Sequence, residues 1–383
     1  MSAALADVLR GKKVICCVGS GGVGKTTISA ALALRAAVDG KRALVLTIDP
    51  ARRLANSLGL KELGNQETRI DGALFAAAGL KPRGEMWAMM LDLKLTWDEL
   101  VKAQAGSPEQ ANAILGNNLY QTLSTAMAGS LEYMAMEKVY EVASSGRFDV
   151  VVLDTPPTTN ALDFLHAADR ILDVLDNTAM RIMLGPMLKA GKLGFKLLAV
   201  PSSLVLKTLA RFTGADFLRD LAAFMLAFDG MYEGFKERAR KVKALLASSD
   251  AAFVLVTSPN PLTIQEALFF SQALKDDGIA TAAVVVNRVQ RDPRRHGGPD
   301  NLSAVREALA MAQVKGAADL AGRLWQTLTD QATLADLDRR EIERLTSTLR
   351  EVPLFAVPRL RRDVHDLAGL WQVSENLETM GER

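Results

Sequence analysis

One short segment constrains this chain more than any other: Gly19–Thr26, with the sequence GSGGVGKT, is a complete GxxxxGK[ST] pattern. It follows the apolar, β-branched run Val14–Val18 and precedes the alanine-rich stretch Thr26–Val38, which has the character of a helix. The pattern forms a phosphate-binding loop when it lies between a strand and a helix. Its glycines let backbone N–H groups turn inward around phosphate oxygens, and the helix N-terminus adds positive potential. The segment therefore predicts a P-loop.

The side chains of this loop have distinct expected roles. Lys25 bridges the β- and γ-phosphates of a nucleotide, and the hydroxyl of Thr26 ligates Mg²⁺. A glycine-rich turn without a ligand is the alternative, and the flanking strand and helix count against it. We expect the phosphates to be bound by Gly21, Gly22, Val23, Gly24, Lys25, Thr26 and Thr27.

Two aspartates follow apolar runs elsewhere in the chain. Asp49 ends the run Ala43–Ile48, and Asp154 ends the run Val150–Leu153. Ligands of open α/β sheets bind at the carboxyl ends of the strands, so both acids are expected to face the phosphates. Asp154 suits Mg²⁺, directly or through water, and Asp49 is expected to orient the attacking water as a catalytic residue beside Lys25. The alternative for each aspartate is a helix N-cap.

Apolar runs without alternation recur along the chain and suit strands that are buried on both faces of a parallel sheet. Helical stretches separate them, which predicts an α/β fold of the P-loop NTPase type, with a doubly wound, mainly parallel sheet. The expected strands are Val14–Val18, Ala43–Ile48, Val150–Leu153, Phe253–Thr257 and Ala282–Val286.

The whole chain, residues 1–383, is expected to form a single domain with an inserted α-helical subdomain. The insertions are the two long intervals on either side of the third expected strand, where strand signals are few. We assign the nucleotide core to about residues 12–60, 146–165, 250–290 and 350–372, the helical client subdomain to about 61–145 and 166–249, and an extra helical segment to about 301–350.

Composition narrows the class of protein. Forty-six Lys and Arg against 44 Asp and Glu give a net charge of +2, which argues against a protein that coats nucleic acid. The cysteines, Cys16 and Cys17, are adjacent, so they can form neither a disulfide framework nor a thiolate zinc site within one chain. No apolar run reaches the length of about 18 residues that a spanning helix needs, and the first residues do not resemble a signal peptide. A cytoplasmic protein is expected.

Five motifs in order resemble the ArsA/Get family, the arsenite-pump and tail-anchored-protein-targeting ATPases of the deviant P-loop class. They are GGVGKTT, TIDPARRLANSLG, LDTPPTTNALDFL, the segment from VTSPNPLTIQEALFF to AAVVVNRV, and VPLF. The resemblance covers nearly the whole chain and implies a Mg²⁺-dependent, dimeric enzyme that binds and hydrolyses ATP. It identifies Asp49 as the water-activating residue and Asp154 as the start of the second switch.

The resemblance also assigns the nucleoside end of the site. It identifies Asn287 as the adenine-reading residue, with Pro353 and Leu354 against the ring. Asn260 stands near the nucleotide where some members have a glutamate. An Asn amide pairs with the adenine edge as donor and acceptor together. Residues 287–290, NRVQ, lack the aspartate of a GTPase NKxD motif, so ATP is favoured over GTP.

The chain departs from the family at the P-loop. The family's additional lysine, which reaches the phosphates of the partner subunit, is replaced by Ser20. One interpretation is a homodimer that hydrolyses ATP slowly or uses another cation, for which Arg52, Arg53 and Arg288 are candidates. Another is a heterodimer in which a related subunit supplies the lysine. Solvated surface arginines are the simpler alternative for the three candidates.

Cysteine usage also differs from the family. No CxxC pair is present, so we expect no zinc, and arsenite transport is not expected because the dispersed cysteines of the pump are missing. Cys16 and Cys17 are expected to lie on opposite faces of the first strand as buried apolar fillers.

The helical insertions suggest a client. Eleven of the 14 methionines lie between Met86 and Met231, and flexible thioethers suit grooves that accept varied apolar partners. With the resemblance, they favour a hydrophobic client segment; core filling is the alternative. The basic segment Gly185–Gly214 is expected to be a mobile lid or to contact a membrane surface transiently, against a plain solvated helix face. Two other functions stay open: a positioning or partition-type ATPase switch, and a weakly catalytic subunit whose nucleotide serves assembly.

Overall fold

The computed structural model describes residues 5–49, 51–126, 130–155 and 231–379, together with residues 166, 169, 220, 223 and 224. The segment expected to form a lid lies outside these residues. The strands are β1 Val14–Val18, β2 Arg42–Thr47, β3 Thr68–Arg69, β4 Glu85–Met90, β5 Val150–Asp154, β6 Ala251–Thr257, β7 Thr281–Val289, β8 Leu354–Pro358 and β9 Glu378–Thr379. The helices are α1 Leu5–Val8, α2 Lys25–Val38, α3 Arg53–Leu58, α4 Gly72–Ala77, α5 Leu93–Gln104, α6 Pro108–Leu115, α7 Asn118–Ala126, α8 Ser130–Ser144, α14 Tyr232–Leu246, α15 Pro261–Asp276, α16 Leu302–Met311, α17 Ala317–Thr348, α18 Leu367–Glu375 and the 3₁₀ turn η1 Pro293–His296.

The strands of this described part form one sheet in the order β3-β4-β2-β5-β1-β6-β7-β8-β9. The strands from β4 to β8 are parallel, and the two-residue strands β3 and β9 pair antiparallel at the edges. β1 lies in the middle, between β5 and β6, with Cys17 in register with Asp154. The predicted fold class, an α/β P-loop sheet, is therefore confirmed.

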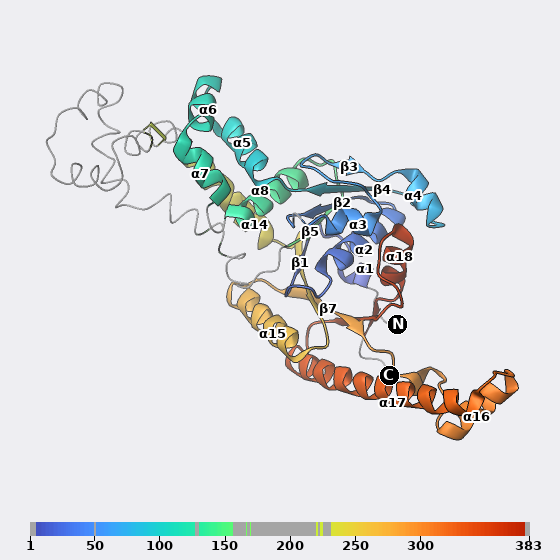
Figure 1. Cartoon of the computed structure of the whole chain (residues 1–383). Helices are drawn as coiled ribbons and strands as arrows, with labels where there is room; N and C mark the ends of the chain where they lie inside the picture. Colours follow the sequence, from blue (N-terminus) through green and yellow to red (C-terminus); the bar gives the residue numbers. More distant parts are fainter. Residues whose placement is uncertain are drawn as a thin grey trace.

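Helices cover both faces of the sheet (Figure 1), and a hydrophobic cluster lies on each face. Helices α1, α2, α3, α4 and α18 pack on the face that carries Ile15 and Cys17. Helices α5, α7, α8, α14, α15 and the end of α17 pack on the face that carries Val14 and Cys16. Both cysteines are fully buried, one in each layer, as the alternation of a strand requires. The prediction that they fill the core on opposite faces is confirmed.

The expectation that the helical subdomain starts at residue 61 is wrong. β3 and β4 lie in that interval, and β4 pairs in parallel with β2, with Ala43 opposite Met86. The sequence of β4, EMWAMM, has no β-branched residue, so its composition does not indicate a strand. Burial beside β2 overrides local propensity here, and the helices of the inserted part begin only with α5.

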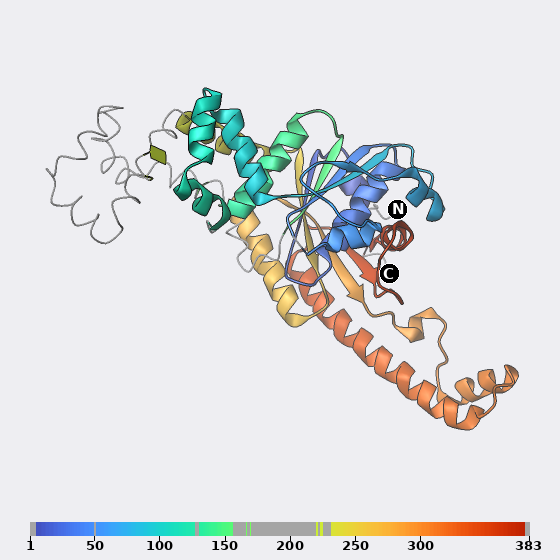
Figure 2. The ribbon, with the colours of Figure 1, turned by 45° about the horizontal axis from the view of Figure 1, so that its top comes forward.

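Two helices, α16 and α17, extend away from the sheet after β7 (Figure 2). They match the extra helical segment expected over residues 301–350. The last residues of α17, Ile342 and Leu345, return to the core and lead into β8. The connection therefore carries the chain out of the domain and back to the sheet edge beside β7.

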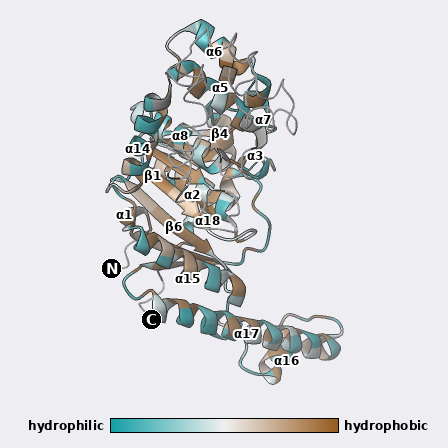
Figure 3. Ribbon diagram, turned by 90° about the vertical axis from the view of Figure 1, so that its left-hand side faces the viewer, coloured by the Kyte–Doolittle hydropathy of each residue, from teal (hydrophilic) through white to brown (hydrophobic). Residues whose placement is uncertain are grey.

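Five of the methionines that suggested a client groove are core residues. Each is at most 1% exposed: Met86, Met89, Met134, Met136 and Met231. Met90 is half-buried, and the others of that group lie outside the described residues. Core filling is thus the correct interpretation for these five. The apolar residues of the sheet lie between more hydrophilic helices (Figure 3). Within the described ranges, no helix has both the length and the apolar character needed to cross a bilayer.

Candidate functional site

The P-loop connects β1 to α2 as the pattern predicts. Gly24, the residue before α2, has φ +98°, which favours glycine because an L side chain is strained there. Lys25 turns back over the loop, and its Nζ donates hydrogen bonds of 2.8 Å to the carbonyls of Gly19 and Ser20. Its side chain is buried, and burial lowers the pKa of Lys25, while Asp154 and Asp49 act in the opposite direction. The Lys25 ammonium group is thus held at the loop by hydrogen bonds to two carbonyls and by the charges of two nearby carboxylates.

Asp154 forms the centre of a buried polar cluster at the ends of β2 and β5. The hydroxyls of Thr26 and Thr47 each donate to its Oδ2 over 2.8 Å. The carboxyl group is inaccessible to solvent, and this burial raises its pKa to about 6. Its other oxygen, Oδ1, has no hydrogen-bond partner. A buried carboxylate oxygen without a partner is costly unless a ligand completes it.

This cluster fits a divalent cation. Oδ1 of Asp154 and the hydroxyl of Thr26 are oxygen donors of the kind that Mg²⁺ prefers. Within the described ranges, no group of three or more His, Cys, Asp or Glu side chains could hold a metal. Mg²⁺ usually keeps water and substrate phosphates among its ligands, so one carboxylate and one hydroxyl suffice at a phosphate site.

Asp49 lies on the wall of the same pocket as Lys25 and Thr26. Its Oδ1 accepts a 2.9 Å hydrogen bond from the amide of Ala51, and its Oδ2 lies 3.4 Å from Nη1 of Arg53. The amide of Asp49 donates to the hydroxyl of Thr47 over 3.2 Å. Thr47 therefore connects the two aspartates. The sequence analysis did not include Thr47, although its position at the end of β2 was a usable signal.

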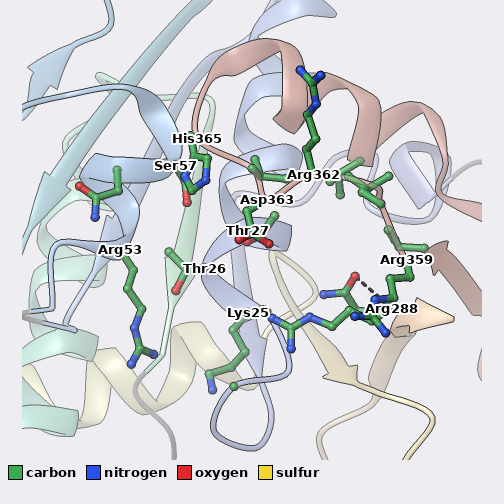
Figure 4. Close-up of a pocket in the computed structure, with 18 of the residues that line it drawn as sticks. Lys25, Thr26, Thr27, Arg53, Ser57, Arg288, Arg359, Arg362, Asp363 and His365 are labelled. Atoms are coloured by element: carbon green, nitrogen blue, oxygen red, sulfur yellow. Dashed lines mark hydrogen bonds between the residues drawn. The ribbon is translucent and has the colours of Figure 1, made fainter. Parts of the chain in front are cut away.

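The pocket has a volume of about 990 Å³. Its phosphate end is formed by the P-loop and by Asp49, Arg53 and Thr155. Its other end is formed by the ends of β7 and β8 and the segments that follow them (Figure 4). The chain after β8 contributes two arginines, an aspartate and a histidine. These are Arg359, Arg362, Asp363 and His365. These residues lie within the predicted nucleotide core, about 350–372, but none of them was predicted as a site residue because they match no local motif.

Asn287 ties the two ends of the pocket together. Its Nδ2 donates to the carbonyl of Val23 over 2.8 Å, and its Oδ1 accepts from the amide of Arg288 over 2.9 Å. A Cβ on Gly24 would lie 2.3 Å from Nδ2 of Asn287, so the contact requires glycine at that position. With Oδ1 holding the backbone and one N–H holding the P-loop, one N–H remains for a base. The second lone pair of Oδ1 also remains, so the combined donor and acceptor pairing expected with adenine stays a prediction.

The structure does not bring Pro353 and Leu354 to the pocket. Leu354 is 3% exposed and belongs to the core, and the carbonyl of Pro353 accepts from the amide of Val284. Both residues stand where β8 begins, whereas ligands bind where parallel strands end. The end of β8 instead supplies Val357 and Pro358 to the pocket. Two similar runs, VPLF and VPRL, lie close together in the sequence, and the second one lines the pocket.

Two further expected residues have structural roles. Asn260 caps α15, with its side chain accepting from the amide of Leu262 over 3.0 Å, and it is not among the residues that line the pocket. The side chain of Val23 is buried in the core, and its carbonyl accepts a hydrogen bond from Asn287. The capping role of Asn260 follows from its place directly before Pro261.

The structure also shows the contact of Ser20 and the positions of the three candidate arginines relative to the pocket. The hydroxyl of Ser20 donates to a carboxylate oxygen of Glu266 on α15. Arg52 precedes α3 in a left-handed conformation and is not among the residues that line the pocket. Arg53 and Arg288 do line it, and Arg53 is paired with Asp49. Of the three candidates, Arg52 is therefore the one outside the site.

A glycine-rich loop, a buried lysine and strand-end carboxylates on a parallel sheet define a P-loop nucleoside triphosphatase. A model of the family described as anion-transporting ATPase, ArsA_ATPase, matches residues 12–308. The chain is 28% identical over 276 residues to "ATPase get3" of Aspergillus terreus, which covers 71% of each chain. It is 27% identical over 274 residues to "ATPase GET3" of Paracoccidioides lutzii, again with 71% of each chain covered. The chain belongs to the ArsA-type ATPase family and is an ATPase.

Proposed function

We propose that this ATPase hydrolyses Mg²⁺-bound ATP and that its nucleotide state controls the binding of a hydrophobic client segment to its helical part. The observation that supports the chemistry best is the buried cluster at Asp154, whose Oδ1 lacks a partner beside the hydroxyl of Thr26. Burial of this oxygen without a hydrogen-bond partner costs free energy, and a bound cation would offset that cost.

Each residue has a role in this proposal. Thr26 and Asp154 hold Mg²⁺, which when bound neutralises charge on the phosphates. Lys25 exchanges its two P-loop carbonyls for phosphate oxygens, which it is already positioned to meet. Asp49 accepts a proton from the attacking water or orients it, because its carboxylate lies on the pocket wall near Lys25.

The path to the helical part begins at β5. α8 precedes β5 in the chain, and its side chains Tyr133 and Met134 share one hydrophobic cluster with Leu153. Glu137 of α8 also forms an ion pair with Arg238 of α14, which joins two helices of this layer. A nucleotide that moves the end of β5 through Asp154 therefore changes the packing of α8 and its neighbours.

We propose that the working assembly is a dimer. The contact between Ser20 and Glu266 leaves no cation at position 20, so the alternatives are a homodimer with another cation or a heterodimer with a lysine-bearing paralogue. Turnover of the purified chain, measured alone and with such a paralogue, separates the two. Vigorous turnover of the chain alone, with a mass of two chains by sedimentation, contradicts the heterodimer.

The variant Asp49→Asn tests the proposed function. Asn keeps the oxygen that accepts from Ala51, so the loop is preserved while the base is removed. We expect hydrolysis to slow by about 10²- to 10⁴-fold with nucleotide affinity nearly unchanged. Asp39→Asn is the matched control, because Asp39 is exposed at the end of α2 and pairs only with Arg35 in the described part of the chain.

Client binding is measured with the Asp49→Asn variant, which should hold ATP without hydrolysing it, and a fluorescent peptide of about 20 apolar residues. We expect its affinity to differ between the ATP-bound and ADP-bound states. Equal affinity in both states contradicts the coupling and leaves the ATPase chemistry intact. Failure of calorimetry to detect Mg²⁺–ATP binding contradicts the proposal as a whole.

A further inference from the structure

Arg288 occupies an unusual place in the sheet. The register between β7 and β8 shifts between Asn287 and Val289, which makes Arg288 the extra residue of a β-bulge. Its φ is +62°, a left-handed conformation that is uncommon for a residue with a side chain. Bulges next to active sites serve to re-aim a side chain. The bulge directs Arg288 into the nucleotide pocket.

The surroundings hold this conformation firmly. The side-chain oxygen of Asn287 accepts from the amide of Arg288 over 2.9 Å, and the amide of Arg359 donates to the carbonyl of Val289 over 2.8 Å. The strained residue is thus fixed by hydrogen bonds on both sides. Backbone strain that the surroundings maintain is a feature of functional sites.

The guanidinium of Arg288 has no ion pair or hydrogen bond with any other described residue. Figure 4 shows it extending from the end of β7 toward the P-loop. Arg53, the other arginine near the phosphates, is paired with Asp49. Arg288 is therefore a cation of the pocket that no carboxylate of the described chain neutralises. Arg359 and Arg362 also line the pocket, but they lie on the segment after β8.

The charge of the site calls for such a cation. At the phosphate end the carboxylates of Asp49 and Asp154 offset Lys25 and Arg53, so a triphosphate with one divalent cation keeps about two negative charges that this end does not compensate. Arg359, Arg362 and Asp363 line the other end of the pocket. Glu266 adds a carboxylate beside Ser20 on the outer side of the loop. Arginine matches phosphate oxygens with a planar fork of donors and remains charged.

We infer that Arg288 contacts the terminal phosphates of the bound nucleotide from within the same chain and stabilises the charge that develops there during hydrolysis. The inference deepens the proposed function and rests on it, because it requires Mg²⁺–ATP in this pocket. It assigns the missing positive charge to the chain itself, so the chain hydrolyses ATP without a lysine from a partner. Arg288 is then a catalytic residue rather than a solvated surface arginine.

The variants Arg288→Gln and Arg288→Lys test this assignment. We expect Gln to reduce the rate at saturating ATP by about 10²- to 10³-fold. We also expect Gln to weaken ATP binding by about tenfold and ADP binding much less, since the contact is to the terminal phosphates. Lys should recover part of both losses because it restores the charge. Calorimetry gives the binding ratio independently of turnover.

Arg52→Gln is the matched control. Arg52 also has a left-handed backbone, with φ +52°, but it is not among the residues that line the pocket. Its substitution should change neither the rate nor the ratio of ATP to ADP affinity. Thermal unfolding of both Gln variants shows whether either loses its fold.

The outcomes separate the inference from the proposed function. If the unmodified chain binds no Mg²⁺–ATP, the proposed function fails. If it binds Mg²⁺–ATP but hydrolyses it only beside a second type of subunit, the inference alone is overturned. An Arg288→Gln variant that keeps the full rate also overturns the inference. If, in addition, the variant binds ATP and ADP more weakly by the same factor, Arg288 contacts the nucleoside instead of the terminal phosphates.

Discussion

Replacing Asp154 by Asn should make the stability of the ligand-free protein less sensitive to a rise in pH, and it should remove the proposed Mg²⁺ ligand. The carboxyl group is fully buried, and its Oδ1 has no partner. Burial raises its pKa from the usual 3.8 to about 6. Asn has nearly the same shape and keeps an oxygen for the hydroxyls of Thr26 and Thr47, but it carries no charge.

The sign and the size follow from the two pKa values of Asp154. Between about pH 4 and pH 6, the folded protein keeps a proton that the unfolded chain has already released, so stability falls as the pH rises through this window. Above pH 7 the loss levels off at roughly 3 kcal/mol, at about 1.4 kcal/mol for each pKa unit. From pH 4.5 to pH 7.5, the unmodified protein should lose roughly 2 kcal/mol relative to the variant.

Urea unfolding of the ligand-free protein at both pH values measures this difference. Asp149→Asn is the control, because Asp149 lies just before the same strand, and hydrogen bonds from Arg42 lower its pKa. Its variant should lose stability by similar amounts at both pH values, since Asp149 stays ionised throughout this range. With Mg²⁺, Asp154→Asn should weaken ATP binding by about 10- to 100-fold. If the stability difference between Asp154→Asn and the unmodified protein does not change with pH, burial does not raise the pKa of Asp154, and the reasoning is refuted.

Two other substitutions probe the P-loop. Lys25→Met should reduce ATP turnover by about 10²- to 10³-fold without unfolding the protein, because the ammonium that it removes is buried and donates hydrogen bonds to two carbonyls of the loop. Steady-state kinetics and a melting curve measure the two effects. Gly24→Ala should abolish nucleotide binding and lower the melting temperature, because its Cβ would lie 2.3 Å from Nδ2 of Asn287 and its φ of +98° is strained for alanine. An Ala variant that binds ATP normally would show that the loop adapts.

The sequence predicts those parts of the fold in which a short stretch of residues is enough to specify the element. β1, the P-loop and α2 are continuous in the chain, so one motif specifies all three. β5 and β6 are apolar runs buried on both faces, and their pattern needs no long-range information. Lys25, Thr26 and Asp154 belong to these elements, and Asp49 follows β2, which is also an apolar run. Local patterns were therefore enough to single out these four residues as candidates.

The parts that it missed depend on contacts between distant segments. β4 is a strand because it lies beside β2, although its methionines and alanine favour other structures. The pocket wall from Val357 to His365 matches no motif and becomes part of the site only when β8 pairs with β7. The error at Pro353 has the same origin, because nothing local distinguishes the first Val-Pro pair from the second.

The two ends of the pocket differ in how strongly the family constrains them. The phosphate end lies within residues 12–308, which match the family, whereas β8 and the segment after it lie beyond that match. Asn287 is the link, because it holds Val23 on one side and the bulge at Arg288 on the other. A change in the segment after β8 therefore alters the nucleoside end without disturbing the cluster at Asp154, whereas loss of the Asn287 contacts affects both ends. The proposed contact of Arg288 with the terminal phosphates would supply, from this link, the cation that position 20 lacks.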